Sequence, residues 1–205
     1  MTYLFDPTYW NGTIFHLDET KERMSKGWME FEGKNQPIPA SFFPKSLTFD
    51  AASAALPDTF HTTRDIIVFS KRARVVFEEW APDQVEFIPV ICQASPAIAA
   101  TLKFDSAYYF INVLGRAQRL QWLEIPTRTL PPQEDGTEVV TLLPGLRNWR
   151  LRERAASEPL IWRDTAWIVG NKRYSAHSNV FIADALWREL DANFPDQLNA
   201  QRVGE

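Results

Sequence analysis

Glycine is scarce in this chain, which has 8 glycines in 205 residues. A loop that wraps a phosphate needs closely spaced glycines, because only glycine lets the backbone approach the ligand so closely. The sequence contains no G-x-x-x-x-G-K-[ST], no G-x-G-x-x-G and no G-x-S-x-G pattern. These absences argue against a P-loop nucleotidase, a Rossmann-type dehydrogenase and an α/β-hydrolase with a nucleophile elbow.

Cysteine and histidine are also rare. The single cysteine, Cys92, has no partner for an internal disulfide. This favours a reducing compartment, so we expect a cytoplasmic protein. The three histidines, His16, His61 and His177, lie far apart and form no metal-ligand pair. We therefore expect neither a metal nor another cofactor.

A small hydrolase remains open as an alternative. Ser175 and His177 lie on the same side of an extended segment, but such residues do not face each other as a nucleophile and its base must. Cys92 follows an apolar run, which is typical of a small buried hydrophobic residue. No two carboxylates stand at a spacing that would pair them for acid–base work. We expect no enzymatic activity.

The chain also lacks long apolar runs and an excess of positive charge. No stretch of about 18 apolar residues is present, and no basic segment followed by an apolar one opens the chain, so we expect neither a membrane span nor a secretory signal. The net charge of -4 disfavours nucleic acid as a partner and is compatible with a basic protein. Arg147, Arg150, Arg152 and Arg154, with Trp149 among them, are better explained as a solvated strand face.

Residues Arg64 to Ile91 carry the clearest structural pattern. Ile66 to Phe69 predict a buried strand, Ser70 stands where a helix N-cap belongs, and an amphipathic helix follows and ends before Pro82. Val85 to Ile91 predict a second strand, in which Pro89 indicates an edge or a bulge.

A similar pattern returns in Asn179 to Phe194. An apolar run leads to Asp184 as the N-cap of a second amphipathic helix, and placing Asp184 on Ser70 aligns Leu190 with Val76. Two interpretations stay open: chance recurrence of a strand that runs into a capped helix, or a weak internal repeat.

The other segments predict short strands without long crossovers. We therefore expect an α+β fold, with a mostly antiparallel sheet and two or three amphipathic helices packed against it. A helix is predicted after Ser95-Pro96, an edge strand at the N-terminus, and a helical tail in the last ten residues. The expected strands are Trp28 to Glu32, Ser46 to Phe49, Ala107 to Leu114, Leu120 to Ile125, Glu138 to Leu143 and Leu160 to Val169.

The order of these motifs resembles a family of bacterial immunity proteins encoded beside polymorphic or secretion-system toxins. The resemblance lies in five segments and covers roughly residues 60–198. It implies a single domain over residues 1–205, in which residues 1–60 form an extension or subdomain. The segments are Asp65 to Ser70, Val85 to Ile91, Tyr108 to Leu114, Ile161 to Arg163 and Val180 to Leu186.

This resemblance implies a protein that binds and neutralises a cognate toxin encoded nearby. Such a protein needs a rigid surface with a charged rim, and an acidic rim speeds encounter with a basic toxin. We expect the toxin-binding residues among Trp28, Glu30 and Glu32 on an acidic strand face, and among Glu134 and Asp135 in a proline-rich loop. An adaptor of a secretion system would share the same acidic, aromatic-rich character and is a second candidate.

Overall fold

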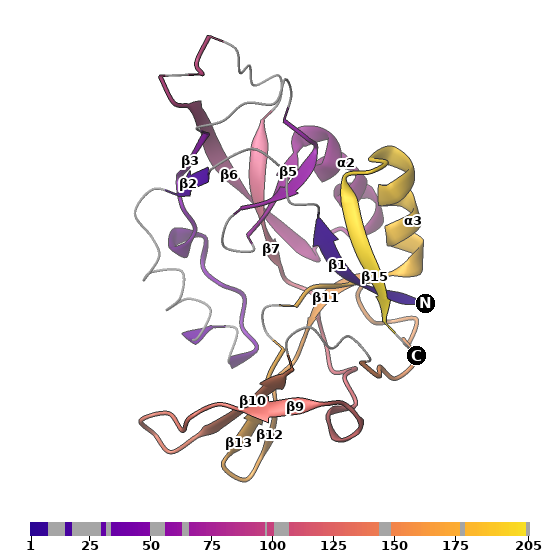
Figure 1. Cartoon of the computed structure of the whole chain (residues 1–205). Coiled ribbons are helices and arrows are strands. Elements are labelled where there is room, and N and C mark those ends of the chain that lie inside the picture. The colour runs from indigo at the N-terminus through magenta and orange to yellow at the C-terminus, as the bar shows by residue number, and fades with distance from the viewer. Residues whose placement is uncertain are drawn as a thin grey trace.

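The computed structural model describes residues 1–7, 15–17, 30–31, 34–49, 56–62, 66–96, 98–100, 107–143, 149–176 and 179–203. They form three β-sheets, and two ten-residue helices that lie side by side against the larger sheets (Figure 1). Most neighbouring strands are antiparallel, so the mixed, mostly antiparallel fold predicted from the sequence is confirmed. No described helix has the length and apolar character needed to span a membrane.

The six-stranded sheet contains the segment with the clearest sequence pattern. Its order is β2-β3-β6-β7-β5-β4, and helix α2 (Lys71–Trp80) connects β5 to β6. The Ser70 hydroxyl oxygen accepts hydrogen bonds from the N–H groups of Arg72 and Ala73, at 3.1 and 3.3 Å, which confirms the predicted N-cap. The strands are β2 (Phe15–Leu17), β3 (Ser46–Phe49), β4 (Thr59–His61), β5 (Ile67–Ser70), β6 (Val85–Ala94) and β7 (Tyr108–Val113).

Pro89 lies in β6 at a position where only one side of the strand is paired with a neighbouring strand. It pairs with Tyr109 of β7, whereas β3 joins the other side of β6 only from Ile91 onward. The N–H of Ile91 donates to Lys45 on that side, so the proline nitrogen two residues earlier faces the same, still unpaired, side. The edge position predicted for Pro89 is therefore correct locally, although β6 is an inner strand of the sheet.

The five-stranded sheet has the order β15-β1-β14-β11-β8, and helix α3 (Asp184–Asn193) connects β14 to β15. The predicted N-cap is wrong by one residue: Ala183 is the N-cap, and it makes no side-chain capping bond. Asp184 lies in the first turn and forms an ion pair with Arg188 at 2.9 Å. The strands are β1 (Thr2–Pro7), β8 (Arg116–Ala117), β11 (Ile161–Asp164), β14 (Phe181–Ala183) and β15 (Leu198–Val203).

The two larger sheets contain the same structural unit twice. Strands β4, β5, β7 and β6 with α2 form the first unit, and β11, β14, β1 and β15 with α3 form the second. The strand registers agree, because Phe69 pairs with Thr59 and Tyr109 while Ile182 pairs with Ile161 and Tyr3. The chain thus contains an internal repeat in which the N-terminal strand completes the second unit.

The same turn follows the helix in each unit. The sequence Pro-Asp-Gln occurs at 82–84 and again at 195–197, and its aspartate has a positive φ both times, 62° at Asp83 and 64° at Asp196. Gln84 Oε1 accepts the N–H groups of Leu160 and Ile161 in the second unit, at 2.7 and 3.3 Å. Gln197 Oε1 accepts those of Asp58 and Thr59 in the first unit, at 2.6 and 3.2 Å. The two glutamines therefore fasten the units to each other reciprocally.

The core lies in three clusters around these sheets. The central cluster is shared by the units and contains equivalent helix residues, with Ala73 and Phe77 from α2 and Leu186 and Leu190 from α3. A second cluster covers the outer face of the first unit, and a third covers the outer face of the second. Each unit thus packs one face of its sheet against the other unit and covers the opposite face with a cluster of its own.

Several local predictions are wrong. Leu120 to Ile125 is not a strand but holds the 3-10 turn η3 (Trp122–Glu124). The last ten residues contain strand β15 rather than a helical tail, and β15 pairs with β1, which makes β1 an inner strand. After Ser95 the described residues form a turn rather than a helix. Leu160 to Val169 divides into β11 and β12 (Trp167–Val169), which belong to different sheets.

Candidate functional site

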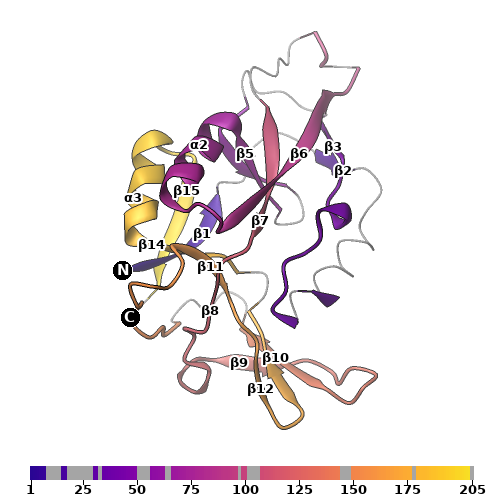
Figure 2. The same ribbon diagram turned by 180° about the vertical axis from the view of Figure 1, so that it is seen from behind.

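A small lobe projects from the body formed by the two units (Figures 1 and 2). We define the lobe as η3 together with the four-stranded sheet of order β12-β13-β10-β9. Its inner face is aromatic, because the ring of Tyr174 lies 5.7 Å from that of Trp122 and 5.0 Å from that of Trp167. Its other strands are β9 (Thr127–Thr129), β10 (Glu138–Leu142) and β13 (Lys172–Tyr174).

Strand β12 has an open side. Among the described residues it pairs with β13 and with no other strand. A two-residue turn at Gly170-Asn171 joins the pair, so Val169 and Trp167 bond to β13 while the N–H and C=O of Ile168 point away from it. The side chain of Ile168 is 67% exposed and that of Val169 is 48% exposed. The lobe therefore presents an apolar strand whose backbone edge is not paired by any described strand.

The open edge of β12 begins after Ala166. Two residues before Ile168, the N–H of Ala166 faces the same side and donates to Asn35 Oδ1 at 2.6 Å. Asn35 comes from the segment of residues 34–49, which closes the edge up to that point. The unpaired part of the edge is thus limited to β12 itself.

A pocket of about 250 Å³ lies beside β12. Leu123 stands at its rim with its side chain 80% exposed, whereas the ring of Trp122 is buried. Among the residues that the structure describes, the indole N–H of Trp122 has no hydrogen-bond partner. The pocket is lined by Gln118, Leu120, Gln121, Trp122, Leu123, Glu124 and Trp167.

Two carboxylates occupy the exposed tip of the lobe. Glu134 and Asp135 lie in the loop between β9 and β10, and every residue from 131 to 136 is exposed. The backbone N–H of Thr137 donates to Asp135 Oδ1 at 2.9 Å and holds the pKa of Asp135 below its ordinary value. The tip therefore carries negative charge at neutral pH.

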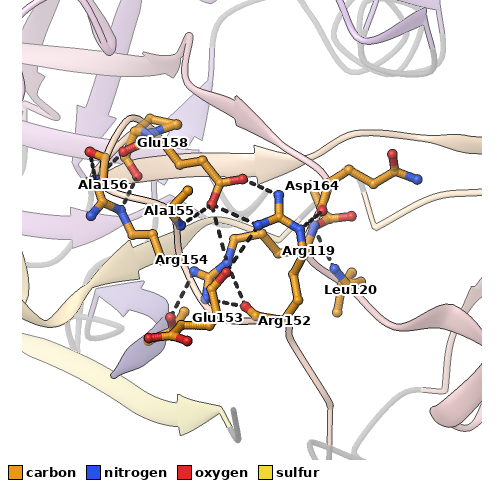
Figure 3. Close-up of polar contacts among 12 residues, drawn as sticks. Arg119, Leu120, Arg152, Glu153, Arg154, Ala155, Ala156, Glu158 and Asp164 are labelled. Carbon is orange, nitrogen blue, oxygen red and sulfur yellow. Dashed lines mark hydrogen bonds and ion pairs between the residues drawn. The ribbon is translucent and has the colours of Figure 1, made fainter.

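A buried ionic network holds the base of the lobe on the second unit (Figure 3). Asp164 Oδ2 accepts hydrogen bonds from the backbone N–H groups of Arg119 and Leu120, at 2.7 and 3.0 Å, while Oδ1 has no partner in the described part of the chain. Burial raises the pKa of Asp164 to about 6, although these hydrogen bonds act in the opposite direction. The guanidinium of Arg119 lies 4.8 Å from the ring of Trp162 and donates to Thr2 and to the carbonyl of Arg152.

The strand predicted to carry the arginines is wrong over residues 152–155, which form no strand, and an isolated bridge pairs Leu151 with Leu120. The arginine side chains instead make contacts at the base of the lobe. Arg150 pairs with Glu124 at 3.0 Å, and Arg152 forms an ion pair with Glu158. Arg154 donates to backbone carbonyls, including that of Pro159 at 3.2 Å. These side chains stabilise the base of the lobe, and Arg147 lies outside the described residues.

The predicted acidic strand face is placed only in part. Glu30 is exposed, but it has helical geometry and Phe31 forms a turn, so the strand predicted there is wrong at these two residues. Trp28 and Glu32 lie outside the described residues. The chain brings Glu30 within five residues of Asn35, which bonds to the start of the open edge.

The residues weighed for catalysis lie apart where the structure describes them, because Cys92 belongs to β6 of the six-stranded sheet and Ser175 follows β13 of the lobe. Ser175 is buried and its N–H bonds to Val140, while His177 lies outside the described residues. Burial raises the pKa of the Cys92 thiol to about 12, so the thiol is protonated at neutral pH. Within the described ranges, no cluster of three or more His, Cys, Asp or Glu residues could hold a metal ion.

Sequence reasoning missed the edge residues Ile168 and Val169 and the pocket residues Trp122 and Trp167. Their segments were predicted as strands, and a sequence does not state which strand has a free side. The available signal was the Gly170-Asn171 turn, which implies a hairpin whose first strand carries the sequence Trp-Ile-Val.

No protein-family model matches the chain, and no curated protein is similar enough to count as a relative.

Proposed function

We propose that this chain is an immunity protein that binds and neutralises a cognate toxin in the producing cell, and that the lobe makes the contact. The observation that carries the proposal is the gathering of exposed apolar side chains on the lobe. Large exposed apolar groups that cluster, unlike single ones, mark a surface for another molecule. On the lobe, Leu123 and Trp167 line an open pocket, and the exposed Val169 shares the face of β12 that carries Trp167. The exposed Ile168 lies on the opposite face of the same strand.

The charge of the lobe supports the same function. The exposed carboxylates of Glu134 and Asp135 lie in the loop between β9 and β10, at the same end of the sheet as the Gly170-Asn171 turn. An acidic rim accelerates encounter with a basic toxin, and the buried apolar contacts then slow its dissociation. Both properties serve a protein that must capture its target before the target acts.

The proposal is tested with the product of the adjacent gene. Expressed alone, this product should stop growth, and co-expression with the chain should restore it and yield a stable complex. A neighbour that is harmless alone would contradict the proposal. Preferential capture of secretion-machine components would favour the adaptor instead.

A matched pair of variants assigns the contact to the lobe. Ile168→Asp places a charge on the apolar edge, and Val75→Asp places one on helix α2, where Val75 is 54% exposed. We expect growth rescue to fail with Ile168→Asp and to persist with Val75→Asp. Equal rescue by both variants would move the toxin-binding surface away from β12.

A further inference from the structure

We propose that the open edge of β12 receives an extended segment of a basic protein partner, which adds a fifth strand to the sheet of the lobe. This inference rests on the proposed function and states how the partner is held. It differs from a general apolar contact because it requires main-chain hydrogen bonds to one particular strand.

The backbone of β12 is arranged for such an addition. The N–H and C=O of Ile168 point to the open side, while Ala166 on the same side is already bonded to Asn35. An incoming strand would therefore bond to Ile168 and continue toward the Gly170-Asn171 turn. Strand addition of this kind derives its affinity from the main chain and its specificity from side-chain pockets.

The pocket at Trp167 supplies the side-chain contact. Its volume of about 250 Å³ lies below the range of about 300–1,000 Å³ that small-molecule sites usually occupy. It therefore fits one apolar side chain better than a cofactor. The exposed Leu123 at the rim would be covered by the same side chain.

Charge decides which occupant fits. Glu134 and Asp135 lie at the exposed tip of the lobe, and the chain has a net charge of -4, whereas Glu124 at the pocket is already paired with Arg150. A basic segment is attracted to this surface. A second copy of the chain would bring the same acidic tip and the same net charge, so self-pairing of two β12 edges is opposed.

The experiment removes one outward N–H from either side of the sheet. Ile168→Pro deletes the N–H on the open side of β12 and leaves the bonds to β13 in place. Thr129→Pro is the matched control on β9: Leu130 donates to Val139, so the neighbouring N–H of Thr129 points to the free side of that strand. The probe is the purified product of the adjacent gene, and the readout is its dissociation constant by calorimetry.

We expect Ile168→Pro to weaken binding by about 100-fold and Thr129→Pro to leave it within about 3-fold of wild type. Leu123→Asp, at a side chain too exposed to support the fold, should weaken binding by about 10-fold and serves if Ile168→Pro fails to fold. Thermal melting of each variant reports whether it folds.

Three outcomes would overturn the inference. If the probe binds both proline variants as it binds wild type, the strand addition is wrong while the proposed function stands. If wild type does not bind the probe at all, both fail. If sedimentation shows a wild-type dimer that Ile168→Pro converts to a monomer, a second copy occupies the edge.

Discussion

The two units of the body are alike where they meet and different where they face outward. Toward the shared core, Phe77 of α2 and Leu190 of α3 occupy equivalent buried positions. On the outer faces, Phe60 and Trp162 are equivalent, but Phe60 packs among hydrophobic residues, whereas the guanidinium of Arg119 lies over the ring of Trp162. The common face is required by the fold, and the divergent face of the second unit is where the lobe is attached.

The largest effect should come from the shared face. Phe77→Ala and Leu190→Ala each remove a fully buried side chain from the central cluster, so each should lower the free energy of unfolding by about 3–4 kcal/mol. Urea unfolding measures it, with the exposed Val75→Ala as a control expected within about 0.5 kcal/mol. We expect one cooperative transition in both variants. A second transition in either would show that the units unfold separately.

The next effect belongs to the divergent face. Burial raises the pKa of Asp164 from 3.8 to about 6, so the folded state favours the protonated carboxyl. This preference for the protonated Asp164 stabilises the fold fully below pH 3.8, and the stabilisation is lost as the pH rises through about 6. The free energy of unfolding is therefore lower by about 2–3 kcal/mol at pH 7 than at low pH. In the first unit, the residue equivalent to Asp164 is the uncharged Thr62, because β4 and β11 have the same strand register in their units.

Asp164→Asn isolates this contribution, because asparagine keeps the acceptor and cannot ionise. Between pH 4 and pH 7 the stability of wild type should fall relative to that of the variant, as measured by urea unfolding at each pH. A constant difference across this range would show that burial does not penalise the ionised Asp164.

Gln84 and Gln197 allow the equivalence of the two units to be tested. Gln84→Ala and Gln197→Ala each remove one acceptor shared by two backbone N–H groups. Each should lower the free energy of unfolding by about 1–2 kcal/mol, and glutamate at either position should restore most of it because it retains an acceptor oxygen. Strongly unequal losses would break the symmetry inferred from the structure.

The smallest effect concerns the helix starts, where the units differ. Ser70 caps α2 and also donates to Asp58, whereas Ala183 leaves α3 without a side-chain cap. Ser70→Ala should cost about 1 kcal/mol, and Ala183→Ser should gain less than about 1 kcal/mol. Chemical denaturation compares the two. A gain from Ser70→Ala would contradict the capping role.

Sequence patterns predicted the elements that depend on local chemistry. The first unit was predictable because Ser70, the apolar stripe of α2 and Pro82 act within a few residues of one another. Asp184 was misplaced as a cap because its residue type fits, whereas in the structure its N–H donates to Met1 and its side chain pairs with Arg188. Local propensity does not contain a contact with the other end of the chain.

Features that depend on pairing between strands far apart in the sequence could not be predicted from local patterns. Strand β15 was predicted as a helical tail because its partner β1 is at the opposite end of the chain. The open side of β12 follows from the order of strands in the lobe, which no local pattern encodes. Of the predicted binding residues, Glu134 and Asp135 could be assigned to an exposed loop because proline and glycine surround them.

The most direct test of the account is hydrogen exchange at β12, measured on the chain alone and in complex with the product of the adjacent gene. The amide of Ile168 lies on the open edge and should exchange rapidly in the free chain. We expect complex formation to slow it by at least about tenfold, while the amide of Thr129 on the opposite edge keeps its rate. Unchanged exchange at Ile168 in a complex that still forms would contradict the assignment of the lobe edge as the binding surface.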